Sequence, residues 1–123
     1  MLDKLSVHVA TAGLLLCAAA TAAEIPIAIK SDPEGRHAVV EQQGTSENPV
    51  LITRRAGPDG RIHYMKRSID CRKWAVRNLG EGPTLDAMNK GQPDPEPSTI
   101  EAGSIPDHYA RQACPPPHPA TKP

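Results

Sequence analysis

The sequence predicts a small α+β domain in which an antiparallel sheet of three to five strands packs against one short C-terminal helix. Residues 50–56 and 61–69 flank a Gly-Pro-Asp-Gly turn and predict a hairpin, because proline presets the turn and Gly60 can adopt a positive φ angle. The stretch before Cys114 places apolar side chains at helical spacing. A disulfide from Cys71 to Cys114 would tie this helix to a central strand.

The first 23 residues have the order of a cleavable secretory signal, with one lysine, an apolar core and then small residues. The core is rich in alanine and shorter than the roughly 20 apolar residues of a membrane helix, so we expect no stable membrane span. We place the cleavage after Ala23, with a cut after Ala22 as the alternative. Cys17 follows Leu16, whereas a lipoprotein peptidase needs a small residue there. We therefore expect an exported protein, located in the periplasm, on the cell surface or in the medium.

Residues 24–114 are then expected to form a single small extracytoplasmic domain, and residues 115–123 a disordered, proline-rich tail. The chain of 123 residues has 14 prolines but only one tryptophan, two tyrosines and no phenylalanine. A core this thin offsets chain entropy only narrowly, so we expect a covalent staple. After removal of the signal, Cys71 and Cys114 can pair in only one way, and export places them in an oxidising compartment. Redox pairs and metal sites usually have closer cysteine spacing, which favours a structural disulfide.

The N-terminal half predicts extended structure. Residues 24–30 alternate isoleucine with proline and alanine, which indicates a short edge strand. Residues 37–43 are a weaker second strand, and residues 44–49 are a polar loop. We expect the second strand of the hairpin to run on as far as Leu79. Its polarity does not alternate cleanly, which a bulge near Lys66 or burial on both faces would explain.

The C-terminal half predicts loops and two short helices. Residues 80–103 are expected to be mostly loop, with a helical turn or two from Thr84 to Lys90. The last element is expected to be a short helix that begins at Ser104 or Pro106. The disulfide would tie the end of this helix to the long strand.

Basic side chains concentrate in the hairpin and just after it, although the formal net charge of the chain is zero. Between residues 51 and 77, eight basic residues face only two acidic ones. One interpretation is a binding patch for an anionic surface or an acidic protein. The alternative is a solvated face whose cations pair with the acidic flanks. The eight candidate residues are Arg54, Arg55, Arg61, Lys66, Arg67, Arg72, Lys73 and Arg77.

A nucleic-acid partner is not expected, because such a site keeps its cations on one face and adds stacking aromatic side chains. We assign the single tryptophan, Trp74, to the core and not to a binding surface, because few other large side chains can fill that core. Strand alternation predicts two separate groups of cations, with Arg61, Arg67, Lys73 and Arg77 on one face and Lys66 and Arg72 on the other.

We expect no enzymatic activity, metal or other cofactor. The chain has no GxSxG or HExxH motif and no phosphate-binding glycine loop, and a domain this small has little volume to shape a pocket. The histidines after the signal lack the compact spacing of metal ligands. A site built from His63 and a distant ligand is the one alternative for a metal.

Two segments carry a family resemblance. Residues 68–79 contain an Asp-Cys pair followed by a basic and aliphatic stretch, and residues 103–114 contain a Gly-Ser turn, a short helix and a closing cysteine. Together they resemble the C-terminal half of surface-adhesin E-like domains, which are small exported bacterial proteins. The resemblance implies an antiparallel sheet packed by a C-terminal helix, the same disulfide, and binding to host matrix or plasma proteins as in the best-known members.

These observations predict an exported, non-enzymatic binding module at the cell envelope or surface, adhesin-like and acting through the basic hairpin. The alternative is a periplasmic housekeeping or inhibitor protein that binds an envelope enzyme. A protein or an anionic surface is the partner expected for the first interpretation.

Overall fold

The computed structural model describes residue 13 and residues 23–120. The predicted signal segment before residue 23, except residue 13, lies outside the described residues, and so do Cys17 and residues 121–123. The described part of the chain forms six strands and two helices. In order these are β1 (Ile25–Ile27), β2 (Arg36–Gly44), β3 (Pro49–Ala56), β4 (Ile62–Asp70), β5 (Ala75–Gly82), α1 (Leu85–Asn89), β6 (Ser98–Thr99) and α2 (Ile105–Ala113).

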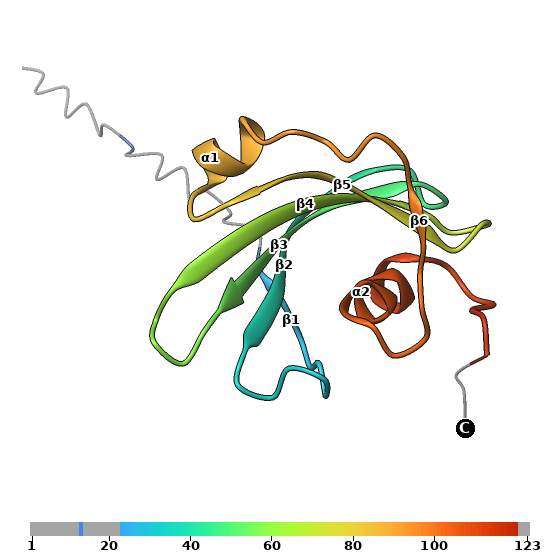
Figure 1. The fold of residues 1–123 in the computed structure, drawn as a ribbon, viewed down its shortest axis with the longest axis horizontal. Helices are drawn as coiled ribbons and strands as arrows, with labels where there is room; N and C mark the ends of the chain where they lie inside the picture. Colours follow the sequence, from blue (N-terminus) through green and yellow to red (C-terminus); the bar gives the residue numbers. More distant parts are fainter. Residues whose placement is uncertain (1–12, 14–22, 121–123) are drawn as a thin grey trace, which may run out of the picture.

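The six strands form one antiparallel sheet in which each strand pairs with the next one along the chain. The sheet curves around α2, and α1 lies on its other side against β4 and β5 (Figure 1). We call the face toward α2 the inner face and the opposite one the outer face. Side chains that stand opposite each other in the register share a face, so the register assigns each strand residue to one of the two.

The predicted α+β class is wrong, because the molecule is mostly a six-stranded sheet with two short helices of five and nine residues. The predicted range of three to five strands is also too low. The strand expected to reach Leu79 instead reverses over residues 71–74 and returns as β5. Asp70 causes this reversal, since its Oδ1 accepts hydrogen bonds from the backbone N–H groups of Arg72 and Lys73 at 3.1 and 3.0 Å. This turn needs neither glycine nor proline, and the sequence gives little sign of it.

The hairpin of β3 and β4 is confirmed. Its turn closes with a hydrogen bond of 3.0 Å from the backbone N–H of Gly60 to the carbonyl oxygen of Gly57, and Gly60 has a φ of 79°. A residue with a side chain would be strained in this left-handed conformation. The bulge expected near Lys66 is also present, because the register with β5 shifts between Lys66 and Arg67.

Both predicted helices are confirmed at their N-termini. The Thr84 hydroxyl accepts a hydrogen bond of 3.1 Å from the backbone of Ala87 at the start of α1. The Ser104 hydroxyl accepts one of 3.3 Å from the backbone of Asp107 at the start of α2. Each cap satisfies a backbone donor that has no partner within the helix.

The core lies between the inner face and α2. Leu51 and Ile69 come from the sheet and Tyr109 and Ala110 from α2, and none of the four exposes more than 1% of its surface. Trp74 is 8% exposed and belongs to the same cluster, as predicted. A single layer of large side chains thus fills the space under the curved sheet.

The predicted disulfide is confirmed. Cys71 directly follows β4, which lies inside the sheet between β3 and β5, and Cys114 is the C-terminal cap of α2. The bond therefore joins the reversal between β4 and β5 to the end of the helix that covers the inner face.

The described part of the tail packs against the domain. The His118 ring lies 5.8 Å from the Trp74 ring between centroids, and Arg111 Nη2 donates a hydrogen bond of 2.7 Å to the carbonyl oxygen of Pro119. The run of prolines predicts a fully solvated end. The structure instead places His118 beside Trp74 and joins Pro119 to Arg111.

We predict that replacing both cysteines by serine lowers the free energy of unfolding by about 4 kcal/mol, the chain-entropy value for a loop of this length. The two cysteines are 43 residues apart. Urea denaturation of the wild type and the double variant measures the difference, and the reduced wild type should show the same loss. A difference below about 1 kcal/mol would mean that the sheet and α2 hold together without the bond.

Candidate functional site

The structure distributes the eight predicted basic residues over several places and does not bring them together as one patch. Strand alternation placed Arg67 and Arg77 on the same face, which is wrong because the chain reverses between them and Arg67 stands opposite Asn78. The inner face carries Arg55 and Arg67, the outer face carries Arg54, Lys66 and Arg77, the turn between β3 and β4 carries Arg61, and the loop between β4 and β5 carries Arg72 and Lys73.

Local contacts hold Arg54, Arg61 and Arg77. Arg54 forms an ion pair with Glu24. Arg61 lies 3.2 Å from the carboxylate of Asp59. Arg77 Nε donates a hydrogen bond of 2.7 Å to a backbone carbonyl in the loop after α1. The interpretation of a solvated face fits these three residues better than that of a binding patch.

The loop of residues 71–74, here named the basic loop, presents Arg72 and Lys73 to solvent. The Arg72 side chain is 80% exposed, and its closest carboxylate contact is Glu47 at 3.9 Å. The loop backbone is fixed at its start, since the N–H of Cys71 donates to the carbonyl oxygen of Glu47 at 3.0 Å. The disulfide fixes the same residue to α2. Two exposed cations therefore stand on a restrained backbone.

Trp74 ends the basic loop in an unusual conformation, with a φ of 52°. A residue with a side chain loses roughly 1–2 kcal/mol in this left-handed region. Burial of the indole against the core offsets that cost, because a large aromatic side chain gains about as much or more when it leaves water. The same four residues thus reverse the chain and place the only tryptophan in the core.

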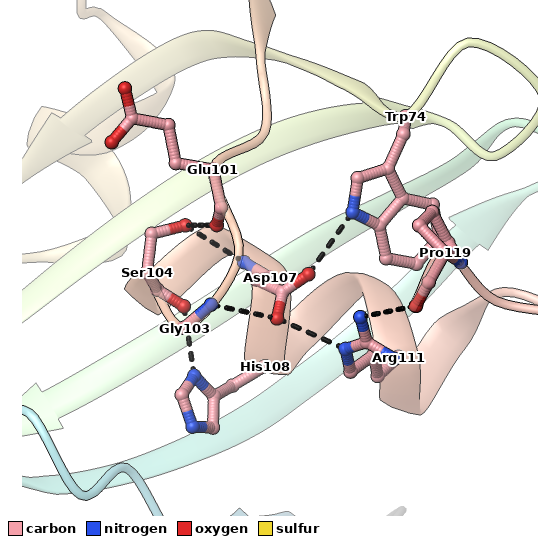
Figure 2. Close-up of polar contacts among 8 residues, drawn as sticks. All are labelled: Trp74, Glu101, Gly103, Ser104, Asp107, His108, Arg111 and Pro119. Carbon is pink, nitrogen blue, oxygen red and sulfur yellow. Dashed lines mark hydrogen bonds and ion pairs between the residues drawn. The ribbon is translucent and has the colours of Figure 1, made fainter. Parts of the chain in front are cut away.

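A polar cluster at the start of α2 holds the indole (Figure 2). Trp74 Nε1 donates a hydrogen bond of 3.0 Å to Asp107 Oδ1. Asp107 Oδ2 accepts hydrogen bonds from the backbone N–H of Gly103 at 3.1 Å and from Arg111 Nε at 3.0 Å. The Arg111 guanidinium also lies 5.6 Å from the centre of the Trp74 ring. One carboxylate therefore links the basic loop, the start of α2 and its last turn.

Burial and hydrogen bonding shift the pKa of Asp107 in opposite directions. Burial alone would raise the pKa of this carboxyl, which is 2% exposed. The hydrogen bonds from Arg111, Gly103 and Trp74 favour the charged form and hold the pKa below its ordinary value. Asp107 is therefore a charged residue with a structural role, buried under the basic loop.

A second polar cluster lies on the inner face. Arg55 holds the carboxylate of Asp32 with two hydrogen bonds of 2.6 and 3.0 Å. His37 Nε2 lies 2.6 Å from Asp32 Oδ2, and His37 Nδ1 lies 3.1 Å from the Tyr109 hydroxyl. Because the carboxylate can only accept, His37 donates to Asp32 from Nε2. Hydrogen bonds from Arg55 and His37 hold the pKa of Asp32 well below its usual range.

This Asp-His-Tyr chain is buried at its tyrosine end. Tyr109 is 1% exposed, and burial raises the pKa of its hydroxyl, so it stays protonated at neutral pH. Through these contacts the chain links β2 to α2. Sequence reasoning missed this contact because His37 and Tyr109 are 72 residues apart and no local pattern relates them.

Arg67 differs from the other seven cations because it packs against a hydroxyl group and an aromatic ring. Its Nη1 donates a hydrogen bond of 2.9 Å to the Thr53 hydroxyl, and its guanidinium lies 5.4 Å from the centre of the Tyr109 ring. No carboxylate among residues 23–120 forms an ion pair with it. Burial lowers the pKa of Arg67 from the usual arginine value. The side chain borders a cavity beside α2.

Neither a metal cluster nor a membrane helix is found in the described part of the chain. No three His, Cys, Asp or Glu side chains of residue 13 and residues 23–120 gather as metal ligands would, and His63 has only Glu81 beside it, at 3.3 Å. Neither of the two described helices has the length and apolar character needed to cross a bilayer.

Comparisons with models of protein families, with curated proteins and with solved structures find no match for this chain. The resemblance to surface-adhesin E-like domains therefore stays a hypothesis.

We predict that Asp107→Asn lowers the free energy of unfolding by about 2 kcal/mol, because the new amide group opposes donors that the carboxylate accepts. Asp86→Asn is the matched control. Asp86 also stands in the first turn of a helix, but its side chain is 77% exposed, so the change should cost less than about 0.5 kcal/mol. Chemical denaturation measures both values. Equal losses of free energy would show that Asp107 contributes only as a negative charge near the N-terminus of a helix.

We predict that the domain loses stability in acid. The pKa values of Asp32 and Asp107 are lower in the folded state than the ordinary carboxyl value of about 4. Their contribution is therefore present above about pH 4 and is lost as the pH falls through the folded pKa values, because the unfolded chain binds protons first. Thermal unfolding between about pH 5 and 2 measures this decrease. Asp32→Asn should flatten it, and an unchanged slope would contradict the assignment to Asp32.

Proposed function

We propose that this chain is an exported, non-enzymatic binding module of the cell envelope or surface, adhesin-like in its role, that contacts an acidic protein or an anionic surface through the basic loop. The observation that carries this proposal is the exposure of Arg72 and Lys73 on a backbone fixed by the disulfide, the Asp70 cap and the buried Trp74. The basic hairpin as a whole is not the proposed site, because Arg54, Arg55 and Arg61 already pair with carboxylates.

A fixed backbone favours binding. Association costs the ordering of loops and side chains at the interface, and a loop that is already ordered avoids the backbone part of that cost. Arginine is also among the residues that contribute most at protein interfaces, because it forms paired hydrogen bonds with carboxylates. The basic loop provides one such side chain with a lysine beside it.

The charges of the basic loop are available to a partner. Lys73 forms no ion pair within the described part of the chain, and Arg72 has only the exposed contact with Glu47 at 3.9 Å. Exposed pairs of this kind contribute little energy, so a partner can replace Glu47 at small cost. Two adjacent cations in solvent also attract an acidic partner over about 10 Å at moderate salt.

Export agrees with the start of the described fold. Cleavage after Ala23 would leave Glu24 as the first residue, directly before β1 at Ile25, and would keep all the described strands. The disulfide is compatible with an oxidising compartment. Both observations are compatible with the exported location that this proposal requires.

We predict that the exported protein begins at Glu24 and is two hydrogens lighter than the reduced chain, because Cys71 and Cys114 are joined. Mass spectrometry under non-reducing conditions measures both features together. A lipid on Cys17, or two free thiols, would contradict the prediction.

We predict that Arg72→Gln with Lys73→Gln weakens adsorption to immobilised poly-L-glutamate, so that the variant elutes at lower salt than the wild type. The control is Arg61→Gln with Lys90→Gln, which removes the same charge from exposed side chains that already pair with Asp59 and Asp86. The control should elute close to the wild type. Equal shifts in both variants would assign adsorption to net charge and would contradict a role for the basic loop.

Protease treatment of intact cells locates the protein. Digestion at the surface supports adhesion, whereas a protected periplasmic pool supports a protein that binds an envelope enzyme.

A further inference from the structure

A small cavity lies on the inner face of the sheet, between β3, β4 and the start of α2. Its volume is about 130 Å³, which is room for a ligand group of a few heavy atoms. Thr53 and Tyr109 border it and are buried, at 3% and 1% exposed. Arg55 and His63 also border it, and their side chains are 40% and 47% exposed. The cavity therefore has a buried end and an end in contact with solvent.

Arg67 brings an unbalanced positive charge to this cavity. A guanidinium has five N–H donors, and the hydrogen bond to Thr53 accounts for one of them. The Tyr109 ring covers one face of the guanidinium without taking a donor. Taking a charge out of water is costly unless an opposite charge or further hydrogen bonds compensate it. The lowered pKa of Arg67 agrees with incomplete compensation in the described structure.

The other charged groups around the cavity are paired. Arg55 is balanced by Asp32, which it holds with two hydrogen bonds. His63 lies 3.3 Å from Glu81, and both of these side chains are exposed. Arg67 is the one arginine of the lining that forms no ion pair within residues 23–120, and the Glu81 carboxylate acts on it only from beyond ion-pair distance. A group with a single negative charge would balance Arg67, whereas the second charge of a phosphate would be left without a partner.

The remaining lining consists of His37, whose ring nitrogens lie on Asp32 and Tyr109, and of two apolar side chains. Met65 and Ile105 border the cavity from β4 and from the start of α2. Pockets of this kind, with apolar walls and a few directed polar groups, are typical of sites for small ligands. A carboxylate attached to a short apolar chain would place its oxygens on Arg67 and its methylene groups against Met65 and Ile105.

We propose that this cavity binds a monocarboxylate, with Arg67 as the residue that recognises the two oxygens and Met65 and Ile105 as the walls for the adjoining carbon atoms. The source of the carboxylate is either a free short-chain acid or a glutamate side chain of a protein partner. This site is separate from the basic loop and does not depend on the function proposed for it.

Titration of the labelled wild-type protein with butyrate, followed by ¹H–¹⁵N NMR, tests the proposal. Saturable shifts are expected at Thr53, Arg67 and Tyr109, and butyramide, the neutral analogue, should cause none. Arg67→Gln should weaken binding at least tenfold, and Arg61→Gln, which removes an exposed charge, should leave it unchanged. Equal binding of butyramide or of inorganic phosphate, or no shift up to about 50 mM butyrate, would overturn the proposal.

N-acetylglutamate amide separates the two sources, since it carries one carboxylate on a backbone. Tighter binding of this compound than of butyrate supports a protein partner, and binding of butyrate alone supports a free acid.

A second pair of variants keeps the proposal testable if Arg67→Gln does not fold. Met65→Glu places a carboxylate at the cavity wall, and Met65→Gln places a neutral group of the same size there. If Arg67 accepts a carboxylate, the Glu variant should unfold at a higher temperature than the Gln variant at neutral pH, and it should no longer bind butyrate. A lower unfolding temperature for the Glu variant would overturn the proposal.

Discussion

The structure depends on the link between the reversal after β4 and the helix α2. The disulfide joins Cys71 to Cys114, and three residues after Cys71 the indole of Trp74 donates to Asp107 in the first turn of the same helix. One connection is covalent and acts at the end of α2, and the other is polar and acts at its start. Because a helix of nine residues is unstable alone in water, α2 depends on these two attachments and on the core that it covers. The curved sheet in turn depends on α2, which buries its inner face.

The same constraint connects stability with the proposed binding role. Trp74 can occupy the core only because the loop before it turns sharply, and this turn leaves Arg72 and Lys73 pointing away from the core. The left-handed conformation of Trp74 is compensated by burial, so the backbone that carries the exposed cations keeps its conformation. A loop designed for flexibility would have glycine at this position, where the left-handed conformation has no steric cost. Tryptophan at this position therefore makes the loop less flexible, and Arg72 and Lys73 lie on a restrained backbone.

Local signals in the sequence account for the parts of the fold that were predicted correctly. The turn at Gly60, the caps at Thr84 and Ser104 and the pairing of two cysteines each depend on a few neighbouring residues or on a count. The strand count failed at Asp70, where a turn without glycine or proline divides one expected strand into β4 and β5, and at β6, which lies in a segment expected to be loop. The error at Asp70 also placed Arg77 on the wrong face. The contacts of Asp107 and Tyr109 link distant segments, and composition or periodicity could not predict them.

The two candidate sites differ in the physics of their charges. Arg72 and Lys73 are hydrated, so they lose little by being unpaired, and their attraction for a partner is long in range and weakened by salt. Arg67 lies against Tyr109 and Thr53, where water screens it less, so a matching anion would gain more energy per contact and depend less on salt. The basic loop is thus suited to the first encounter with a large acidic partner, whereas the cavity is suited to the selection of one small group by shape and charge. The zero net charge of the chain conceals this difference, because acidic residues elsewhere balance the basic segment in number, whereas within residues 23–120 none of them forms an ion pair with Arg67.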